Sequence, residues 1–148
     1  MSENERIIRK LYQLAEGGDL AAFAAMFGDH GVFVDMPTGA TFRGPDTGKP
    51  VAYYASAFPD MHRALGRFIE SGNVIVVELT LNGTHTGPLI LPGGKIEPTH
   101  RKIKVPCCDV FVIEAGKVAS FHCYNLVSTL FTQLGVLNHL AATSLPNA

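Results

Sequence analysis

The side chain in this sequence with the clearest chemical meaning is a carboxylate, Asp109, within an alternating apolar run. Neighbouring residues of a strand point to opposite faces, so the odd-numbered residues from 103 to 113 share one face. That face is mainly apolar, whereas the other carries Lys102 and Lys104, so Asp109 is expected to point inward. An unpaired buried charge is costly. Two interpretations follow: a carboxylate that caps a turn or pairs with a Lys, or a protonated acid that donates a hydrogen bond.

The same alternation places two more polar residues near this face. Leu81 and His85 share the inward face of the strand before a long loop, and His85 falls at the strand end. Asn125 ends the last strand on its inward face, where it could enter a cavity or cap the following helix. A histidine at a strand end is more often structural than catalytic. For His85 and for Asn125, a structural role and a role in the pocket both stay open.

Aromatic and apolar residues complete the predicted pocket. Tyr53 and Tyr54 are adjacent on a predicted helix and cannot both point inward. Asp35 ends an early strand close to Pro37, which by itself suits a turn-forming role. The side chains expected to bind a ligand are Asn125, His85, Tyr53, Phe111 and Leu81.

Metal and covalent chemistries find no support in the sequence. It contains no H-E-x-x-H motif, no Cys or His pairs at zinc spacing and no G-x-S-x-G motif. Cys107 and Cys108 lie in the middle of a predicted strand, not at a helix N-terminus, so a nucleophilic thiolate is not expected. The sequence therefore predicts a site without a metal ion.

Composition narrows the class of protein. The chain has 148 residues, 47% of them hydrophobic and 17% charged, which predicts a single domain spanning residues 1–148 with a sizeable core. A net charge of −1 makes nucleic acid an unexpected partner. No apolar run is long enough to span a membrane, and the N-terminus has no signal-peptide pattern. The odd number of cysteines favours a reduced, cytoplasmic protein.

Helices are predicted first and long strands afterwards. Ser2 and Glu5 have capping-box spacing before a helix that ends at Gly17, and Asp19 is expected to cap a second helix. The other expected helices cover 50–58 and 126–134, and the expected strands cover 31–36, 41–43, 62–71, 74–85, 101–113 and 118–124. Residues 86–99 are expected to form a loop at a pocket rim. This order favours an α+β fold with a curved antiparallel sheet, N-terminal helices on its concave face and a cavity between the layers.

Short motifs along the chain resemble one known family. They include Gly18-Asp19-Leu20, Asp35-x-Pro37, Phe42-Arg43-Gly44, Phe58-Pro59-Asp60, Gly83-Thr84-His85-Thr86-Gly87 and Leu130-x-x-Gln133-Leu134-Gly135. Together these motifs, over about residues 5–137, resemble the SnoaL-like polyketide cyclases of the nuclear transport factor 2-like superfamily. The resemblance implies a cone-shaped fold, a homodimer and acid–base catalysis without a cofactor. The family's acid–base aspartate aligns with Asn125, and an amide cannot exchange a proton near neutral pH.

A second, partial resemblance concerns ketosteroid isomerases of the same superfamily. Their base and their protonated acid align with Asp35 and Asp109, two carboxylates in different environments. Their helical Tyr aligns with Leu11, with Tyr12 turned away by about 100°, which implies an incomplete oxyanion hole. Asp35 is then the expected base, ionised and partly solvated, and Asp109 the neutral acid.

Three functions compete on this basis. The first is a cyclase or isomerase that removes a proton next to a carbonyl of a small hydrophobic polyketide- or steroid-like molecule. The second is a non-catalytic binder of such a ligand. The third is an epoxide hydrolase, which needs an inward Arg that the strands are not expected to supply. A homodimer is expected through the outer sheet face, which carries Thr80, Thr84, Cys108, Val110 and Val112.

Overall fold

The computed structural model describes residues 1–137 of the chain. It bears out the order of helices first and strands afterwards, and residues 138–148, the end of the predicted domain, lie outside the described residues. The elements are α1 (Glu3–Gly17), α2 (Leu20–Ala25), β1 (Phe27–Asp35), β2 (Ala40–Arg43), the 3-10 helix η1 (Gly44–Gly48), α3 (Lys49–Ala57), β3 (His62–Ser71), β4 (Val74–Thr84), β5 (Leu89–Leu91), β6 (Gly94–Ile96), β7 (Lys102–Glu114), β8 (Lys117–Asn125) and α4 (Val127–Leu134).

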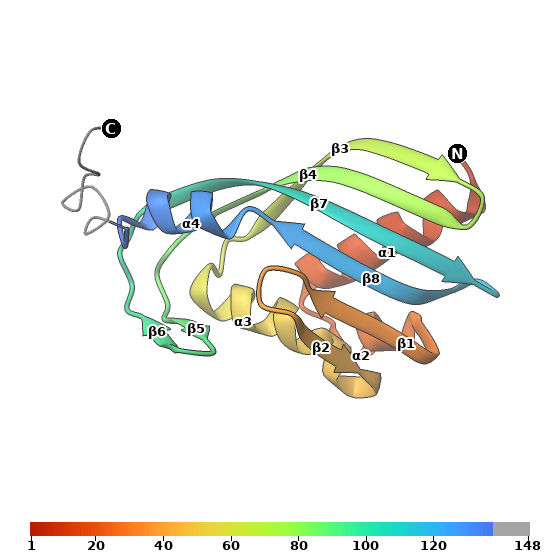
Figure 1. Cartoon of the computed structure of the whole chain (residues 1–148), viewed down its shortest axis with the longest axis horizontal. Helices are drawn as coiled ribbons and strands as arrows, with labels where there is room; N and C mark the ends of the chain where they lie inside the picture. Colours follow the sequence, from red (N-terminus) through yellow and green to blue (C-terminus); the bar gives the residue numbers. More distant parts are fainter. Residues whose placement is uncertain (138–148) are drawn as a thin grey trace, which may run out of the picture.

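Six strands form one curved sheet in the order β2-β1-β8-β7-β4-β3. Helices α1, α2 and α3 lie on one side of it, and the long strands bend over them (Figure 1). A break in the β3–β4 register between Leu65 and Phe68 supplies part of this bend, because a bulged strand turns and twists locally. The predicted α+β fold with a curved sheet is confirmed.

The sheet departs from the prediction in one respect, because it is not wholly antiparallel. Strands β1 and β8 pair in parallel, with Phe27 opposite Val118 and Asp35 opposite Cys123. Helix α2 delivers the chain to β1 at the same end of the sheet at which β8 begins, so the two strands must run in one direction. As a result both strands end at the same edge, which brings Asp35 to the end of β8.

Caps at the N-terminal helices form as their sequence predicts. The Ser2 hydroxyl accepts a hydrogen bond from the backbone N–H of Glu5 at 3.0 Å, and Asp19 accepts one from Ala22 at 3.1 Å. Gly18 ends α1 with φ of +72°, a left-handed conformation that glycine adopts without strain. These caps fix the length of α1 and therefore which of its residues lie over the sheet.

The predicted rim loop 86–99 contains a small hairpin, which the sequence analysis missed. Strands β5 and β6 pair with Leu89 opposite Ile96 and Leu91 opposite Gly94. Leu89 is buried, so its side chain anchors the loop to the rest of the fold. Gly94 has φ of +143°, a conformation that only glycine adopts readily, and it allows the tight turn between two such short strands.

No helix among residues 1–137 combines the length and apolar character needed to cross a membrane.

Candidate active site

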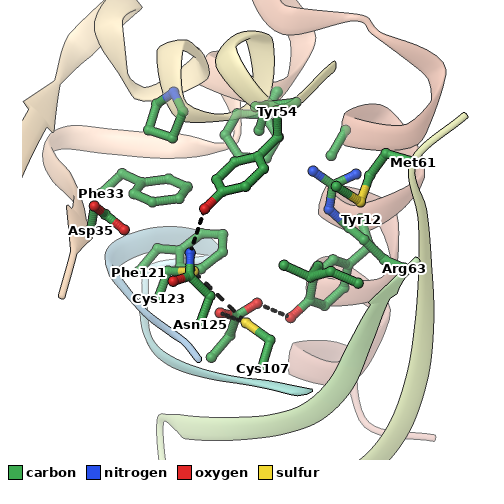
Figure 2. Close-up of a pocket in the computed structure, with 16 residues that line it drawn as sticks. Tyr12, Phe33, Asp35, Tyr54, Met61, Arg63, Cys107, Phe121, Cys123 and Asn125 are labelled. Carbon is green, nitrogen blue, oxygen red and sulfur yellow. Dashed lines mark hydrogen bonds between the residues drawn. The ribbon is translucent and has the colours of Figure 1, made fainter. Parts of the chain in front are cut away.

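A pocket of about 530 Å³, including the part open to solvent, lies between the helices and the sheet. Its walls come from α1, α2, α3 and five strands, and they are mainly apolar. The lining residues are Tyr12, Ala15, Phe23, Phe33, Asp35, Pro50, Val51, Tyr54, Met61, Arg63, Leu81, Cys107, Asp109, Phe121, Cys123 and Asn125 (Figure 2).

Asp109 lies in the wall of this pocket with only 2% of its surface exposed. Its Oδ2 accepts a hydrogen bond from the Tyr12 hydroxyl at 2.7 Å, and its Oδ1 accepts one from the Cys107 thiol at 3.4 Å. Burial raises the pKa of Asp109, and the bonds from Tyr12 and Cys107 offset that effect only in part. The geometry therefore favours the protonated acid over an ion pair.

The placement of Tyr12 corrects the alignment made from sequence. Leu11 and Tyr12 are both buried, so α1 presents a wide apolar stripe to the sheet. The ring of Tyr12 packs edge-on against Phe111 with centroids 5.9 Å apart, and this contact directs its hydroxyl to Asp109. Tyr12 lies four residues after Ile8, one helical turn along the buried face, and that spacing could have identified it. The prediction that Tyr12 is turned away from Asp109 is therefore wrong.

Burial also keeps the Tyr12 hydroxyl protonated, because it raises the pKa of Tyr12 well above its ordinary value. The neighbouring Asp109 acts in the same direction. Tyr12 is therefore a hydrogen-bond donor throughout the physiological pH range, and Asp109 is its acceptor.

Asn125 faces the pocket and does not cap α4. Leu126 is the N-cap residue, and no side chain caps that helix. The Asn125 amide donates to the Tyr54 hydroxyl at 3.1 Å, while its buried Oδ1 has no hydrogen-bond partner among the described residues (Figure 2). Burial raises the pKa of Tyr54 strongly. This pair supplies neutral polar groups for a ligand, and α3 turns Tyr54, not the exposed Tyr53, toward them.

Asp35 is partly exposed and reaches the same pocket from the end of β1. Its Oδ2 accepts a hydrogen bond from the Thr38 hydroxyl at 2.5 Å, within the turn that follows the strand. It also lines a second pocket, of about 820 Å³ with its open part, together with Tyr53 and the β5 strand. Asp35 therefore lines both pockets, and both candidate carboxylates line the first one.

Two of the predicted ligand-binding residues, Phe111 and His85, lie outside both pockets. Phe111 is fully buried behind Tyr12 in the core, whereas Leu81 does line the first pocket. His85 is fully buried, packs against the Phe58 ring at a tilt and accepts a hydrogen bond from the Thr99 backbone N–H at 3.1 Å. Burial lowers the pKa of His85, so it stays neutral and holds the start of the β5–β6 segment. Its role here is structural.

Sequence reasoning also missed an inward arginine. Arg63 lines the pocket from β3, in register with Leu81 on β4. The first residues of β3 alternate between exposed and partly buried positions. The strand has few apolar residues, so its inner face could not be identified from the sequence. The expectation that no strand supplies an inward Arg is therefore wrong.

Within residues 1–137, one group of side chains has the spacing of metal ligands. The Sγ atoms of Cys107 and Cys123 and a carboxylate oxygen of Asp109 lie within 4.8 Å of one another. The two Sγ atoms are 3.9 Å apart, and Asp109 is already bonded to Cys107 and Tyr12. Contact with Cys107, then burial, raises the pKa of Cys123 well above its usual value. These mutual contacts between neutral groups account for the cluster, and no metal is assigned to it.

Replacing Asp109 with Asn is expected to stabilise the fold at neutral and alkaline pH. Because burial raises the pKa of Asp109, the folded chain keeps a proton that the unfolded chain releases as the pH rises. The wild type therefore loses stability between the ordinary Asp pKa and the raised one, by about 1.4 kcal/mol per pH unit. Asn does not titrate and still accepts from Tyr12.

Urea unfolding of both proteins between about pH 4 and pH 9 measures this effect. The gap in unfolding free energy should widen in favour of Asp109→Asn as the pH rises. Parallel curves would show that Asp109 is ionised at little cost in the folded state.

The chain has the ketosteroid isomerase-like, nuclear transport factor 2-like fold. A family model, the SnoaL-like domain, matches residues 8–121, and the chain belongs to this family. The resemblance seen in the sequence motifs is thereby confirmed. Among curated proteins, none matches the chain in sequence.

Solved structures share the fold at low sequence identity. A protein of ketosteroid isomerase-like fold from Catenulispora acidiphila, in complex with trimethylamine, is 19% identical with a TM-score of 0.72, over 87% of this chain and 92% of that chain. A proposed SnoaL-like polyketide cyclase from Shewanella putrefaciens is 13% identical with a TM-score of 0.74, over 92% and 98%. AclR from Streptomyces galilaeus, a proposed hydroxylase, is 18% identical with a TM-score of 0.77, over 99% and 91%. At these identities the likeness shows the fold.

Proposed function

We propose that this protein is a cofactor-independent acid–base enzyme that acts next to a carbonyl of a small hydrophobic, polyketide- or steroid-like molecule. The observation that carries the proposal is the buried pair of Tyr12 and Asp109, which faces the same pocket as the more exposed Asp35. Two carboxyl groups in such different environments can act as acid and base at one pH.

The proposed reaction starts with the ligand carbonyl oxygen against the Asp109 acid proton. Asp35 removes a proton from the carbon next to the carbonyl, and the electron pair of that C–H bond becomes the C=C bond of an enolate. Negative charge moves onto the carbonyl oxygen, where the Asp109 hydrogen bond stabilises it. An isomerase then returns the proton from Asp35 to a different carbon. In a cyclase the enolate carbon attacks a second carbonyl carbon of the same molecule, the π bond of that carbonyl breaks, and its oxygen takes the proton that Asp35 removed.

Tyr12 supports Asp109 in this scheme as a positioning residue. Its hydroxyl donates to Oδ2 at 2.7 Å, whereas Oδ1 accepts only the longer bond from the Cys107 thiol at 3.4 Å, so the acid proton is assigned to Oδ1. Asn125 is a binding group, since its amide exchanges no proton and its free Oδ1 can accept a hydrogen bond from a ligand hydroxyl. The same replacement of the family aspartate favours the alternative function, a binder that holds a hydrophobic ligand without turnover.

Deuterium exchange separates the two functions. We expect the wild-type protein to accelerate exchange at C2 of 1-tetralone, an apolar bicyclic ketone, in D₂O between about pH 5 and pH 9. NMR follows the loss of the C2 proton signal, with heat-denatured protein as the blank. Binding of 1-tetralone without any acceleration of exchange across this range would support the non-catalytic binding function and contradict the enzymatic one.

We expect the protein to be a homodimer that packs through the outer face of the sheet. The residues on that face are only partly exposed and mostly small or apolar, and they are Thr80, Thr84, Cys108, Val110 and Val112. Light scattering at tens of micromolar should give twice the 15.9 kDa mass of one chain. A charge at the centre of the face, Val110→Lys, should shift the protein toward the monomer. A wild-type monomer at that concentration would contradict this arrangement.

A further inference from the structure

Two acidic side chains and one basic side chain line the main pocket, and the proposed chemistry uses only the two acidic ones. Asp35 and Asp109 are the base and the acid, whereas Arg63 has no part in the proton transfer. Figure 2 shows Asp35 and Arg63 on opposite sides of the pocket, with Asn125 between them and Tyr12 on the side of Arg63. The pocket therefore has an arginine at one end and a carboxylate at the other.

The backbone of Arg63 is held firmly while its guanidinium stays available. The register opposite Leu81, whose side chain lines the pocket, turns Arg63 to the inner face of β3. The carboxylate of Glu16 lies next to this strand. It accepts a hydrogen bond from the Arg63 backbone N–H and pairs with the His62 ring at 3.0 Å. That carboxylate is therefore engaged by groups other than the guanidinium.

The Arg63 guanidinium also lacks an ion-pair partner within residues 1–137. The ion pairs of this part of the chain use Arg6, Arg9, Lys49, His62, Arg67 and Lys95. Asp109 is bonded to Tyr12 and Cys107, and the charge of Arg63 acts on it only as a minor influence that opposes the effect of burial on its pKa. A permanently charged, partly buried guanidinium in an apolar wall is a strong site for an anion.

We infer that Arg63 binds a carboxylate of the ligand, so that the substrate is a hydrophobic keto acid. Its carboxylate would lie at the end of the pocket opposite the C–H bond that Asp35 breaks. This inference rests on the proposed function for the position of the reacting carbon. The planar guanidinium can donate two parallel hydrogen bonds to a carboxylate, which fixes the orientation of the ligand as well as its charge.

The surroundings of Arg63 fit such a ligand. Arg63 and Met61 also line a surface depression beside residues 15–18, so the carboxylate end stays close to solvent. A carboxylate bound there would lose less hydration than one bound beside Asp109, which limits the cost of binding it. The apolar body of the ligand would occupy the drier part of the pocket, between Phe33, Phe121 and Leu81.

A matched series of ligands tests the inference. The probes are 1-tetralone-6-carboxylate, its methyl ester and unsubstituted 1-tetralone, with affinities measured by isothermal titration calorimetry. The wild type should bind the acid about 10- to 100-fold more tightly than the ester, because the hydrogen bonds to a charged group are lost in the ester. Arg63→Gln should remove this preference, chiefly by weakening the binding of the acid. The control Arg67→Gln, an exposed Arg on the same strand paired with Glu78, should keep the preference.

Equal binding of acid and ester by the wild type, or no binding of any probe at millimolar concentration, would overturn the inference. A preference that survives in Arg63→Gln would do the same. Deuterium exchange on the methyl ester keeps this outcome separate from the fate of the proposed function. Exchange without a preference for the acid rejects the role of Arg63 alone, whereas a preference for the acid without exchange rejects the enzyme and supports the binding role of Arg63.

Discussion

Replacing Asp35 with Asn is expected to reduce deuterium exchange at C2 of 1-tetralone by about 10²- to 10⁴-fold, the usual contribution of a general base. Asn has nearly the shape of Asp, so the turn that contains Thr38 should keep its geometry while the basic oxygen is lost. The rate of exchange per bound ligand is measured by NMR. The affinity for 1-tetralone should change little, because Asp35 lies at the end of the pocket and its walls are mainly apolar.

The matched control for this experiment is Asp29→Asn. Asp29 lies on the same strand, is exposed and is not among the residues that line the pocket. The Asp29→Asn variant should catalyse deuterium exchange at C2 of 1-tetralone at the wild-type rate. If Asp35→Asn also retained the wild-type rate, the proton would be going to another group, and the assignment of Asp35 as base would have to be abandoned.

The sequence was sufficient for the architecture because the fold depends on signals that are local and redundant. Caps at Ser2 and Asp19 and the alternation in β7 each constrain one element, and no long-range contact is needed to recognise them. The parallel pairing of β1 with β8 and the β5–β6 hairpin were missed. Both depend on which segments meet in space, and residues 89–96 are too short to give a clear alternating pattern.

The candidate site was harder to predict, since its geometry depends on how side chains from separate elements meet. Alternation alone put Asp109 and Asn125 on the inner face, because strand parity is decisive in a sheet with one buried side. The alignment favoured Leu11, although the spacing of Tyr12 from Ile8 places Tyr12 on the buried face as well, and the helix buries both. Arg63 was missed because a charged residue on a weakly apolar edge strand gives no signal of burial.

The position of His85 could be predicted from the sequence, but its role could not. Its place at a strand end beside a loop is compatible with a pocket rim, but the same place serves to anchor the loop. Only the contacts with Thr99 and Phe58 distinguish the two roles.

The second large effect is expected from Asp109→Leu, which removes the acid and keeps a side chain of similar size. Loss of one donor to a developing oxyanion typically costs about 10²- to 10³-fold in rate. This variant leaves the buried Tyr12 hydroxyl without its partner, which costs about 1–3 kcal/mol of stability. The double variant Tyr12→Phe/Asp109→Leu removes both partners and should recover much of that stability without recovering exchange. A folded double variant with the wild-type rate would exclude Asp109 from the reaction.

Asp109→Asn then tests whether the acid must be protonated. The reaction needs Asp109 neutral, so the wild-type rate should fall on the alkaline side of its optimum. Burial raises the pKa of Asp109, so the alkaline fall lies above the range of an ordinary aspartate. An Asn amide donates a hydrogen bond at every pH, though a weaker one than a carboxylic acid. The variant should therefore exchange more slowly than the wild type at the optimum and faster than Asp109→Leu, and its alkaline fall should disappear. An unchanged alkaline limb in Asp109→Asn would mean that another group titrates there and that Asp109 only binds the ligand.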